Sequence, residues 1–223
     1  IAQCLVGSEM CIRDRQMAYQ CQDPTRKQEL LQIASNCTRV PEKGARNFYE
    51  ACQSFWFVQQ LIQMESSGHS ISPGRFDQYM YPYYKSDMEA GNLTREFAQE
   101  LMDCIWVKLN DLNKCRDAAS AEGFAGYSLF QNLIVGGQDK DGNDVTNDLS
   151  VMCILASMHV HLPMPSLSIR VWNGSPHELL IKAAELTRTG IGLPAYYNDE
   201  VIIPALLNRG LTLADAREYN IIG

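Results

Sequence analysis

The sequence predicts an α/β fold that is predominantly helical, and three observations support this prediction. Apolar residues recur at helical spacing over several long segments. A short apolar run closed by two glycines, 132–137, is typical of a buried strand. Helical segments then alternate with further short strands, which indicates an α/β architecture. With 223 residues, 46% of them hydrophobic, the chain suits one domain or two small ones with a real core.

The first part of the chain is predicted to be helical. Asp23-Pro24 begins a helical pattern that ends near Val40-Pro41, because proline disfavours the helical conformation in the residue before it. A long helix follows over 46–65. Its apolar residues cover most of the circumference, which is typical of a helix that is buried on several sides in a large protein.

Turn residues separate the next two segments. Ser72-Pro-Gly74 breaks the chain before an aromatic segment that ends at Gly91-Asn92. Thr94 is expected to cap the following helix, with Leu93 and Ala98 placed as a hydrophobic staple. The apolar residues between 97 and 112 are spaced for one face of this helix.

Strands and helices alternate in the second half. We expect strands over 132–137, 166–172, 196–197 and from 221, and helices over 149–159, 175–186 and 201–208. Pro176 is tolerated in the first turn of its helix, and Gly210 closes the last one. No internal repeat or low-complexity segment is visible.

Composition excludes several classes of protein. The net charge is −7 and the pI is near 5.1, and without a basic stripe nucleic-acid binding has little support. No run of eighteen apolar residues is present to span a membrane, and the start has no signal-peptide core. The eight cysteines form no C-x-x-C pair. Cys52, Cys104 and Cys153 lie in apolar periodic segments, which indicates buried, reduced thiols in a cytosolic protein.

The most informative segment is 68–84, which reads GHSISPGRFDQYMYPYY. It combines five aromatic residues, a Pro-Gly turn, one histidine and an Arg-Phe-Asp-Gln core. This segment resembles the signature of the glycyl radical enzymes, the pyruvate formate-lyase-like superfamily. Within that superfamily it is most similar to the dehydratases of glycerol and 1,2-propanediol.

The resemblance covers roughly residues 17–223. Helices like those that precede the signature are found over 30–56. Later blocks of the family are matched by FQNLIVGGQD at 130–139, LPMPSLSIR at 162–170, GLPA at 192–195, Asn198-Asp199 and DAREY at 215–219. Several motifs in the right order make a chance match very improbable.

The resemblance implies a fold and a reaction. The family fold is a ten-stranded α/β barrel around a central active-site loop, and this chain would supply part of that barrel with its outer helices. The parent protein would remove water from a small diol through a thiyl radical. A partner activating enzyme, using S-adenosylmethionine and an iron–sulfur cluster, would install a glycyl radical, and the enzyme itself would bind no cofactor. The expected setting is the cytoplasm of an anaerobic bacterium, with the full-length protein a homodimer.

Three residues are candidates for the site. The resemblance makes His69 and Ser70 ligands for substrate hydroxyls, and His69 could also protonate the departing hydroxyl because its pKa lies near working pH. Tyr127 corresponds to a tyrosine that lines the pocket of the dehydratases. From the residues alone, His69 is an ordinary loop histidine and Tyr127 an ordinary packed tyrosine whose hydroxyl has a partner. No metal-binding residue is assigned.

Two further pairs of residues are considered for a site: one is better explained by a structural role, and the other has little support as a metal site. Arg75 and Asp77, flanked by aromatics, are more consistent with a buried ion pair that fixes the segment than with catalysis. His159 and His161 could place two imidazoles on one face of a strand, but no third ligand with zinc spacing follows.

The resemblance also predicts which residues follow the C-terminal end of this sequence. In the family, Asp-Ala-Arg-x-Tyr leads directly into Gly-Cys-Val-Glu, so the radical-carrying Cys would follow Gly223 and the acid/base Glu would come two residues later. We therefore expect the chain to be an inactive fragment, with 16–223 a partial pyruvate formate-lyase-like domain.

Residues 5–14 read as the translation of a sequencing-adapter oligonucleotide, so 1–15 are expected to be an artefact. The alternative is a genuine amphipathic start.

Two other functions stay open at this point. The parent could be a different glycyl radical lyase, acting on choline, hydroxyproline, isethionate or an arylacetate, or a formate acetyltransferase-like enzyme. In a different class, the helices alone would fit a non-catalytic helical interaction module. The His69-Ser70 pair favours a polyol substrate.

Overall fold

The computed structural model of the chain describes residues 2–66, 70–112, 117–124 and 129–221, excluding the side chains of 2–8, Ser120 and Phe124. The helices are α1 (Ala2–Gln20), α2 (Pro24–Arg39), α3 (Phe48–Glu65), α4 (Phe76–Glu89), α5 (Arg95–Asp111), α6 (Ala118–Phe124), α7 (Asp148–Val160), α8 (His177–Arg188), α9 (Asp199–Leu207) and α10 (Leu213–Arg217). The strands are β1 (Asn132–Gly136), β2 (Ser166–Val171) and β3 (Ala195–Asn198). The predicted α/β fold, predominantly helical, is confirmed, and its small parallel sheet is consistent with part of a barrel.

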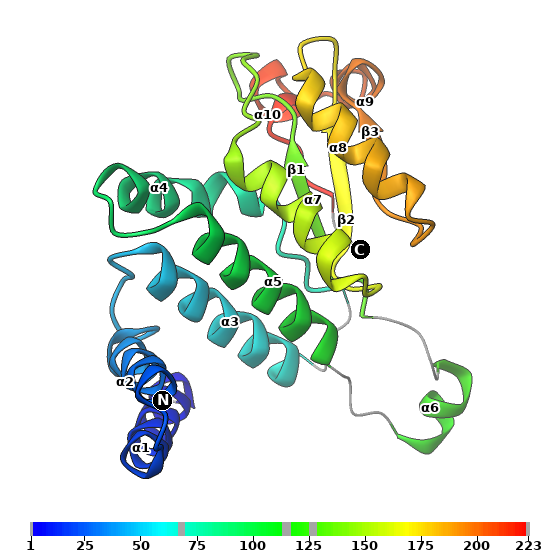
Figure 1. Cartoon of the computed structure of the whole chain (residues 1–223). Coiled ribbons are helices and arrows are strands. Elements are labelled where there is room, and N and C mark those ends of the chain that lie inside the picture. Colours follow the sequence, from blue (N-terminus) through cyan, green and yellow to red (C-terminus); the bar gives the residue numbers. More distant parts are fainter. Residues whose placement is uncertain (1, 67–69, 113–116, 125–128, 222–223) are drawn as a thin grey trace.

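The sheet is parallel throughout, in the order β1-β2-β3. Asn132 of β1 pairs with Ser166 of β2, and Ser168 of β2 pairs with Ala195 of β3. Helix α7 connects β1 to β2, and α8 connects β2 to β3, as parallel pairing requires. Both helices lie beside the sheet in Figure 1.

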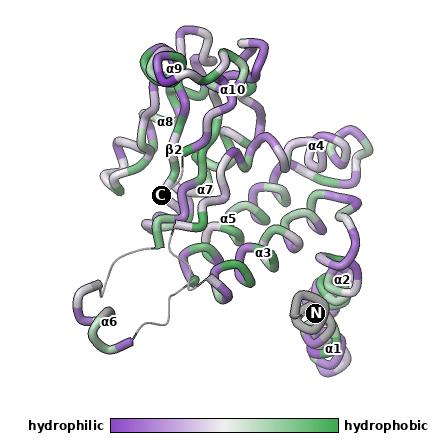
Figure 2. The backbone as a smooth tube through the Cα atoms, turned by 180° about the vertical axis from the view of Figure 1, so that it is seen from behind, coloured by the Kyte–Doolittle hydropathy of each residue, from purple (hydrophilic) through white to green (hydrophobic). Residues whose placement is uncertain are grey.

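The hydrophobic core joins the sheet to the helices. Leu133 and Val135 of β1, and Leu167 and Ile169 of β2, belong to one buried cluster with residues of α3, α4, α5, α7 and α8. Much of α5 and α7 is hydrophobic in Figure 2. Trp106 of α5 is fully buried, and its indole N–H donates to the Ser157 hydroxyl of α7 at 2.8 Å. The shared cluster fixes the sheet to the long helices through one face, and the Trp106 hydrogen bond joins two of these helices.

Several helix ends follow the sequence signals. The Asp23 carboxylate accepts a hydrogen bond from the backbone N–H of Thr25 at 2.8 Å, and α2 ends before Val40-Pro41. The Thr94 hydroxyl accepts from Phe97 N–H at 3.2 Å, as an N-cap residue does. Leu93 and Ala98 are both buried, as the predicted staple requires.

Other parts of the chain differ from the predictions. The aromatic segment forms the helix α4, in which Pro82 is accommodated, and α6 and α10 are also helices that no pattern had indicated. Cys104 is exposed, in contrast to the buried Cys52 and Cys153, because it lies on the outer side of α5. Ile221 lies in no strand.

The N-terminal helices form a pair at one side of the molecule, where α1 packs along α2 (Figure 1). Residues 1–15, expected to be an adapter artefact, include most of α1, and that expectation stays a prediction. In the described part of the chain, no helix combines the length and the apolar character needed to cross a membrane.

Candidate functional site

The two faces of the parallel sheet differ in chemistry. Along β2, Leu167 and Ile169 point into the helix-covered core, while Ser166, Ser168 and Arg170 alternate with them and point to the opposite face. Ser168 and Arg170 are almost completely buried. Burying polar groups is costly unless they are hydrogen-bonded, so this polar face must supply partners for each of them.

An ion pair is buried at the carboxyl end of β2. The Arg170 guanidinium binds the Asp199 carboxylate with two hydrogen bonds, Nε to Oδ1 at 2.9 Å and Nη2 to Oδ2 at 2.7 Å. Both side chains have no exposed surface. Asp199 follows β3 directly, so the ends of two neighbouring strands bring the pair together.

The same guanidinium holds the chain after α10. Nη2 of Arg170 donates to the carbonyl oxygen of Arg217 at 2.7 Å, and Nη1 donates to that of Tyr219 at 3.3 Å. The Tyr219 hydroxyl donates to Asp199 Oδ1 at 2.7 Å. Burial, and then the hydrogen bond to Asp199, raise the pKa of Tyr219, so its hydroxyl stays a donor.

Gly137 makes room for this arrangement. It has a φ of +86°, and a Cβ atom at this position would lie 2.5 Å from Nε of Arg170. Any other residue would therefore displace the guanidinium as well as strain the backbone. Gly137, which the sequence shows only as the last residue of a strand, leaves the space into which the Arg170 side chain fits.

A second polar cluster lies at the amino end of the sheet. Asn132 Oδ1 accepts hydrogen bonds from the hydroxyls of Ser168 at 2.8 Å and Ser166 at 3.2 Å. Asn132 Nδ2 donates to the carbonyl oxygen of Ile221 at 3.0 Å, and the Asn132 backbone N–H donates to the Ser72 hydroxyl at 3.1 Å. Asn132 therefore joins the strands, the segment of Ser72 and the chain after α10.

The last described residues run along the polar face. They contact Arg170 at the carboxyl end of β2 and Asn132 at the amino end of β1, and in Figure 1 this red segment descends beside the strands. Asn220 lies against Gly74, where a Cβ atom would collide with its side-chain amide. Gly74 pairs with β1 through its carbonyl, which accepts from Ile134 N–H at 2.9 Å.

Of the three predicted site residues, Ser70 is described, whereas His69 and Tyr127 lie outside the described residues. Ser70 is half-buried, with a φ of +63°, and its N–H donates to the carbonyl of Leu129 at 2.7 Å. Phe130, in the same contact region, has a φ of +52°. A left-handed conformation is unusual for such residues and is found preferentially at functional sites.

Arg75 and Asp77 fix the segment, but not as the direct ion pair that the sequence suggested. Asp77 Oδ2 accepts from Gly136 N–H at 2.9 Å and from the Ser150 hydroxyl at 2.5 Å, while Arg75 Nη2 donates to the Gln138 carbonyl at 3.1 Å. Each side chain therefore binds the region after β1. Burial is the largest influence on both, raising the pKa of Asp77 and lowering that of Arg75.

The two histidines do not share a strand face. His159 is at the end of α7, where its Nδ1 lies 3.0 Å from the Asp103 carboxylate, and His161 is the C-cap of the same helix with a φ of +53°. Hydrophobic packing made this segment helical, and α7 continues as far as Val160. In the described part of the chain, no three His, Cys, Asp or Glu side chains gather where they could hold a metal ion.

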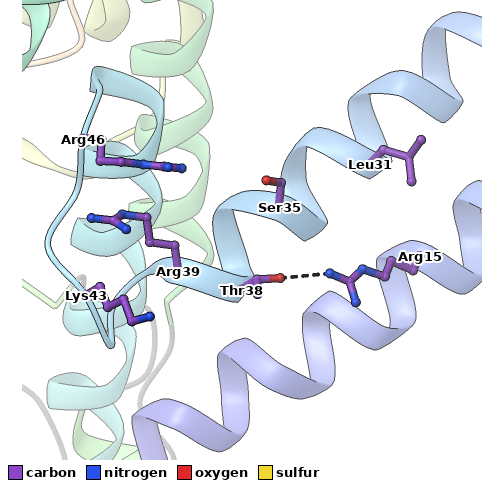
Figure 3. Close-up of a pocket in the computed structure, with 7 residues that line it drawn as sticks. All are labelled: Arg15, Leu31, Ser35, Thr38, Arg39, Lys43 and Arg46. Atoms are coloured by element: carbon purple, nitrogen blue, oxygen red, sulfur yellow. Dashed lines mark hydrogen bonds between the residues drawn. The ribbon is translucent and has the colours of Figure 1, made fainter.

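A basic pocket of about 320 Å³ lies elsewhere, between the N-terminal helices (Figure 3). Arg15, Arg39, Lys43 and Arg46 contribute to its lining. Arg39 and Arg46 both pair with the buried carboxylate of Glu50, and Arg15 donates to the Thr38 hydroxyl at 3.2 Å, so three of the four cations have a partner in the protein. Arg15 belongs to the suspected artefact. This pocket does not contribute to the polar sheet face.

The polar sheet face therefore combines serine hydroxyls, an amide, a tyrosine hydroxyl and an ion pair. These groups bind one another and the chain after α10, so the face is a network that holds this segment. No site role was predicted for Asn132, Arg170, Asp199 and Tyr219. The alternation of serine and arginine with aliphatic residues over 166–171 was the signal that could have indicated a polar inner face.

The family of the chain is settled by comparison with known proteins. A profile described as pyruvate formate lyase-like matches residues 6–223. The chain belongs to this family. The resemblance to the glycyl radical enzymes is thereby confirmed, and the interaction module loses its support.

Two solved structures are similar over the whole chain. One concerns 1,2-propanediol dehydration in Roseburia inulinivorans, with 71% sequence identity and a TM-score of 0.94. The other is the glycerol-bound form of the B12-independent glycerol dehydratase from Clostridium butyricum, with 58% identity and a TM-score of 0.92. This chain covers 28% of each of them.

A curated relative is more distant. The (2S)-3-sulfopropanediol dehydratase of Klebsiella oxytoca is 40% identical over 207 residues, which are 91% of this chain and 25% of that enzyme. The chain therefore spans about a quarter of the length of the relatives it matches.

Proposed function

We propose that the parent protein of this chain is a glycyl radical dehydratase that removes water from a small vicinal diol, either 1,2-propanediol or glycerol. The observation that carries this proposal is the 71% identity, over the whole chain, to the structure concerned with 1,2-propanediol dehydration. The 58% identity to the glycerol-bound dehydratase supports the same class of substrate. Identity to the sulfopropanediol enzyme is lower, at 40%.

The polar sheet face supports this proposal indirectly. Its hydroxyls, its amide and its ion pair bind one another and the chain after α10, so they hold the segments of the site and do not bind the diol themselves.

The residues of this chain bind and orient the diol. Ser70 would accept or donate a hydrogen bond to one hydroxyl, and Tyr127 would line the pocket. His69 would hold the second hydroxyl and give it a proton as it leaves as water. A glycyl radical, when installed, would supply the hydrogen abstraction at the hydroxyl-bearing carbon, by way of the cysteine that the family resemblance implies after Gly223.

The partners follow from this chemistry. An activating enzyme that uses S-adenosylmethionine and an iron–sulfur cluster would install the radical, and the parent would be a homodimer in the cytoplasm of an anaerobic bacterium. The barrel must exclude oxygen and water, because radical intermediates react with both.

The test is a substrate panel with the anaerobically activated parent protein. 1,2-Propanediol should give propanal and water, and glycerol should give 3-hydroxypropanal and water. Choline, isethionate and trans-4-hydroxyproline should give no product. A parent that carries the radical but converts one of these other compounds in preference to the diols would contradict the proposal.

Ser70→Ala tests the site itself. Loss of one hydrogen bond to the substrate should raise the KM for the diol about tenfold, which corresponds to about 1.4 kcal/mol of binding. Ser66→Ala is the matched control, because Ser66 is an exposed serine at the end of α3. Equal KM values for the two variants would remove Ser70 from the site.

A further inference from the structure

We propose that Arg170, Asp199 and Tyr219 form a clamp that positions the chain after α10 for the radical reaction. This inference rests on the proposed function, in which the parent continues past Gly223 into a hydrogen-abstracting cysteine. The three side chains are positioning residues, since they act on the backbone of 217–221 and not on the substrate.

The clamp satisfies the guanidinium almost completely. Arg170 has five N–H groups, and four of them have partners: two on Asp199 and one each on the carbonyls of Arg217 and Tyr219. The guanidinium carbon also lies 4.0 Å from the centre of the Tyr219 ring. Lysine could not reproduce this planar, forked geometry, so the position requires arginine.

Asp199 fixes the clamp from the other side. Its Oδ1 accepts from both Arg170 Nε and the Tyr219 hydroxyl, at 2.9 and 2.7 Å. The Tyr219 side chain is thereby held between the carboxylate at the start of α9 and the guanidinium of β2. Since Arg170 and Asp199 are fully buried, these hydrogen bonds are not exchanged for bonds to bulk water.

A second anchor fixes the direction of the segment. Asn132 binds the Ile221 carbonyl at the opposite end of the sheet, and the close approach of Asn220 to Gly74 leaves little freedom in between. Two anchors at opposite ends of the strands determine both the position and the direction of the chain that leaves Ile221. Ser70 belongs to the segment before α4 that also contacts Asn132, through Ser72.

Positioning of this kind affects the rate more than binding. A reacting group must be held within a fraction of an ångström, and a displacement of about 1 Å can cost about a hundredfold in rate. The diol ligands proposed above lie on other segments, so substrate binding does not depend directly on the clamp.

The first test needs no substrate. Hydrogen–deuterium exchange is measured on the parent protein, for the wild type and for the double variant Arg170→Met with Asp199→Leu. Replacing both members of a buried ion pair by apolar residues is commonly tolerated, so this variant should fold. Amides 218–221 should exchange at least about tenfold faster in the double variant, with β1 unchanged. Equal exchange in 218–221 would overturn the clamp.

The second test measures whether disrupting the clamp lowers kcat. In the activated parent, the double variant and Arg170→Lys should keep the wild-type glycyl radical content by electron paramagnetic resonance and a KM within about twofold. The kcat per radical should fall at least about tenfold. Arg209→Met, at an exposed arginine, is the control and should leave all three quantities unchanged.

The outcomes separate the two proposals. An unchanged kcat per radical in the double variant overturns the positioning role. A fall in kcat that only follows a loss of radical content and of melting temperature also overturns it, because this is what a purely structural pair would show. If the wild-type parent carries the radical but converts neither diol, the proposed function fails, while the exchange measurement still decides whether the clamp exists.

Discussion

The two faces of the three-stranded sheet are held by different interactions, apolar packing on one and hydrogen bonds with an ion pair on the other. On one face, Leu167 and Ile169 join an aliphatic and aromatic core under α7 and α8. On the other face, Asn132 and Arg170 bind the chain after α10. Ser168 holds Asn132 by a hydrogen bond, and Asp199 holds Arg170 by an ion pair. The apolar face can tolerate exchanges that keep its volume, whereas the polar face depends on particular donors and acceptors. Stability and function are therefore expected to separate by face.

The largest effect is expected from the apolar face. Ile169→Ala removes a fully buried side chain and should lower the free energy of unfolding by about 2–5 kcal/mol. Urea denaturation followed by circular dichroism measures this, with Ile181→Ala at an exposed position of α8 as the control. A loss below that of the control would mean that this face is not the main core.

An intermediate effect is expected at Asp77, which connects α4 to the end of β1. Asp77→Ala leaves the buried Gly136 N–H without its acceptor and should cost about 1–3 kcal/mol. Asp77→Asn keeps an oxygen for Gly136 and Ser150, so it should be far less destabilising. Equal losses in the two variants would contradict this role of the carboxylate oxygen.

The raised pKa of Asp77 predicts how the stability of the protein changes with pH. Because burial raises the pKa of folded Asp77, the folded state holds this proton more tightly than the unfolded state does. The stability contribution of Asp77 is present below the ordinary aspartate pKa and is lost as the pH rises through the raised folded value. The unfolding free energy of the wild type should fall relative to Asp77→Asn across this window. Parallel pH profiles would refute the shift.

A small effect is expected at Ser72, at the amino end of the polar face. Ser72→Ala removes the acceptor of the Asn132 N–H and should cost about 1 kcal/mol. Thermal unfolding compared with Ser35→Ala, at an exposed serine of α2, measures the difference. No difference between the two variants would show that this hydrogen bond is dispensable.

The sequence predicted most of the fold because its signals are local. Thr94, Asp23 and the glycines after β1 act within a few residues, and the helices over 149–159 and 175–186 were placed to within two residues at each end. Helix α4 was missed because Pro82 and the clustered aromatics are weak helix formers, and packing of Phe76 and Tyr84 in the core compensates for this.

The candidate site was less accessible to sequence reasoning. Ser70 was predicted through the resemblance, and its role stays a prediction. The contacts of Arg170 join residues 29 to 49 positions apart along the chain. Such pairings depend on the crossovers of the sheet, which no local pattern encodes. The error over Arg75 and Asp77 has the same origin, because nearness in sequence suggested a pair that the fold separates by directing each side chain to the region after β1.

The most direct measurement compares two adjacent residues of β1 that point to opposite faces. The activated parent is assayed with 1,2-propanediol, and the propanal formed per glycyl radical is compared for Asn132→Asp and Leu133→Ile. Asn132→Asp keeps the shape but places a carboxylate oxygen against the Ile221 carbonyl, so turnover per radical should fall at least about tenfold. Leu133→Ile should leave turnover per radical unchanged, even if the melting temperature falls. Full turnover in Asn132→Asp, or a greater loss in Leu133→Ile, would contradict the assignment of function to the polar face.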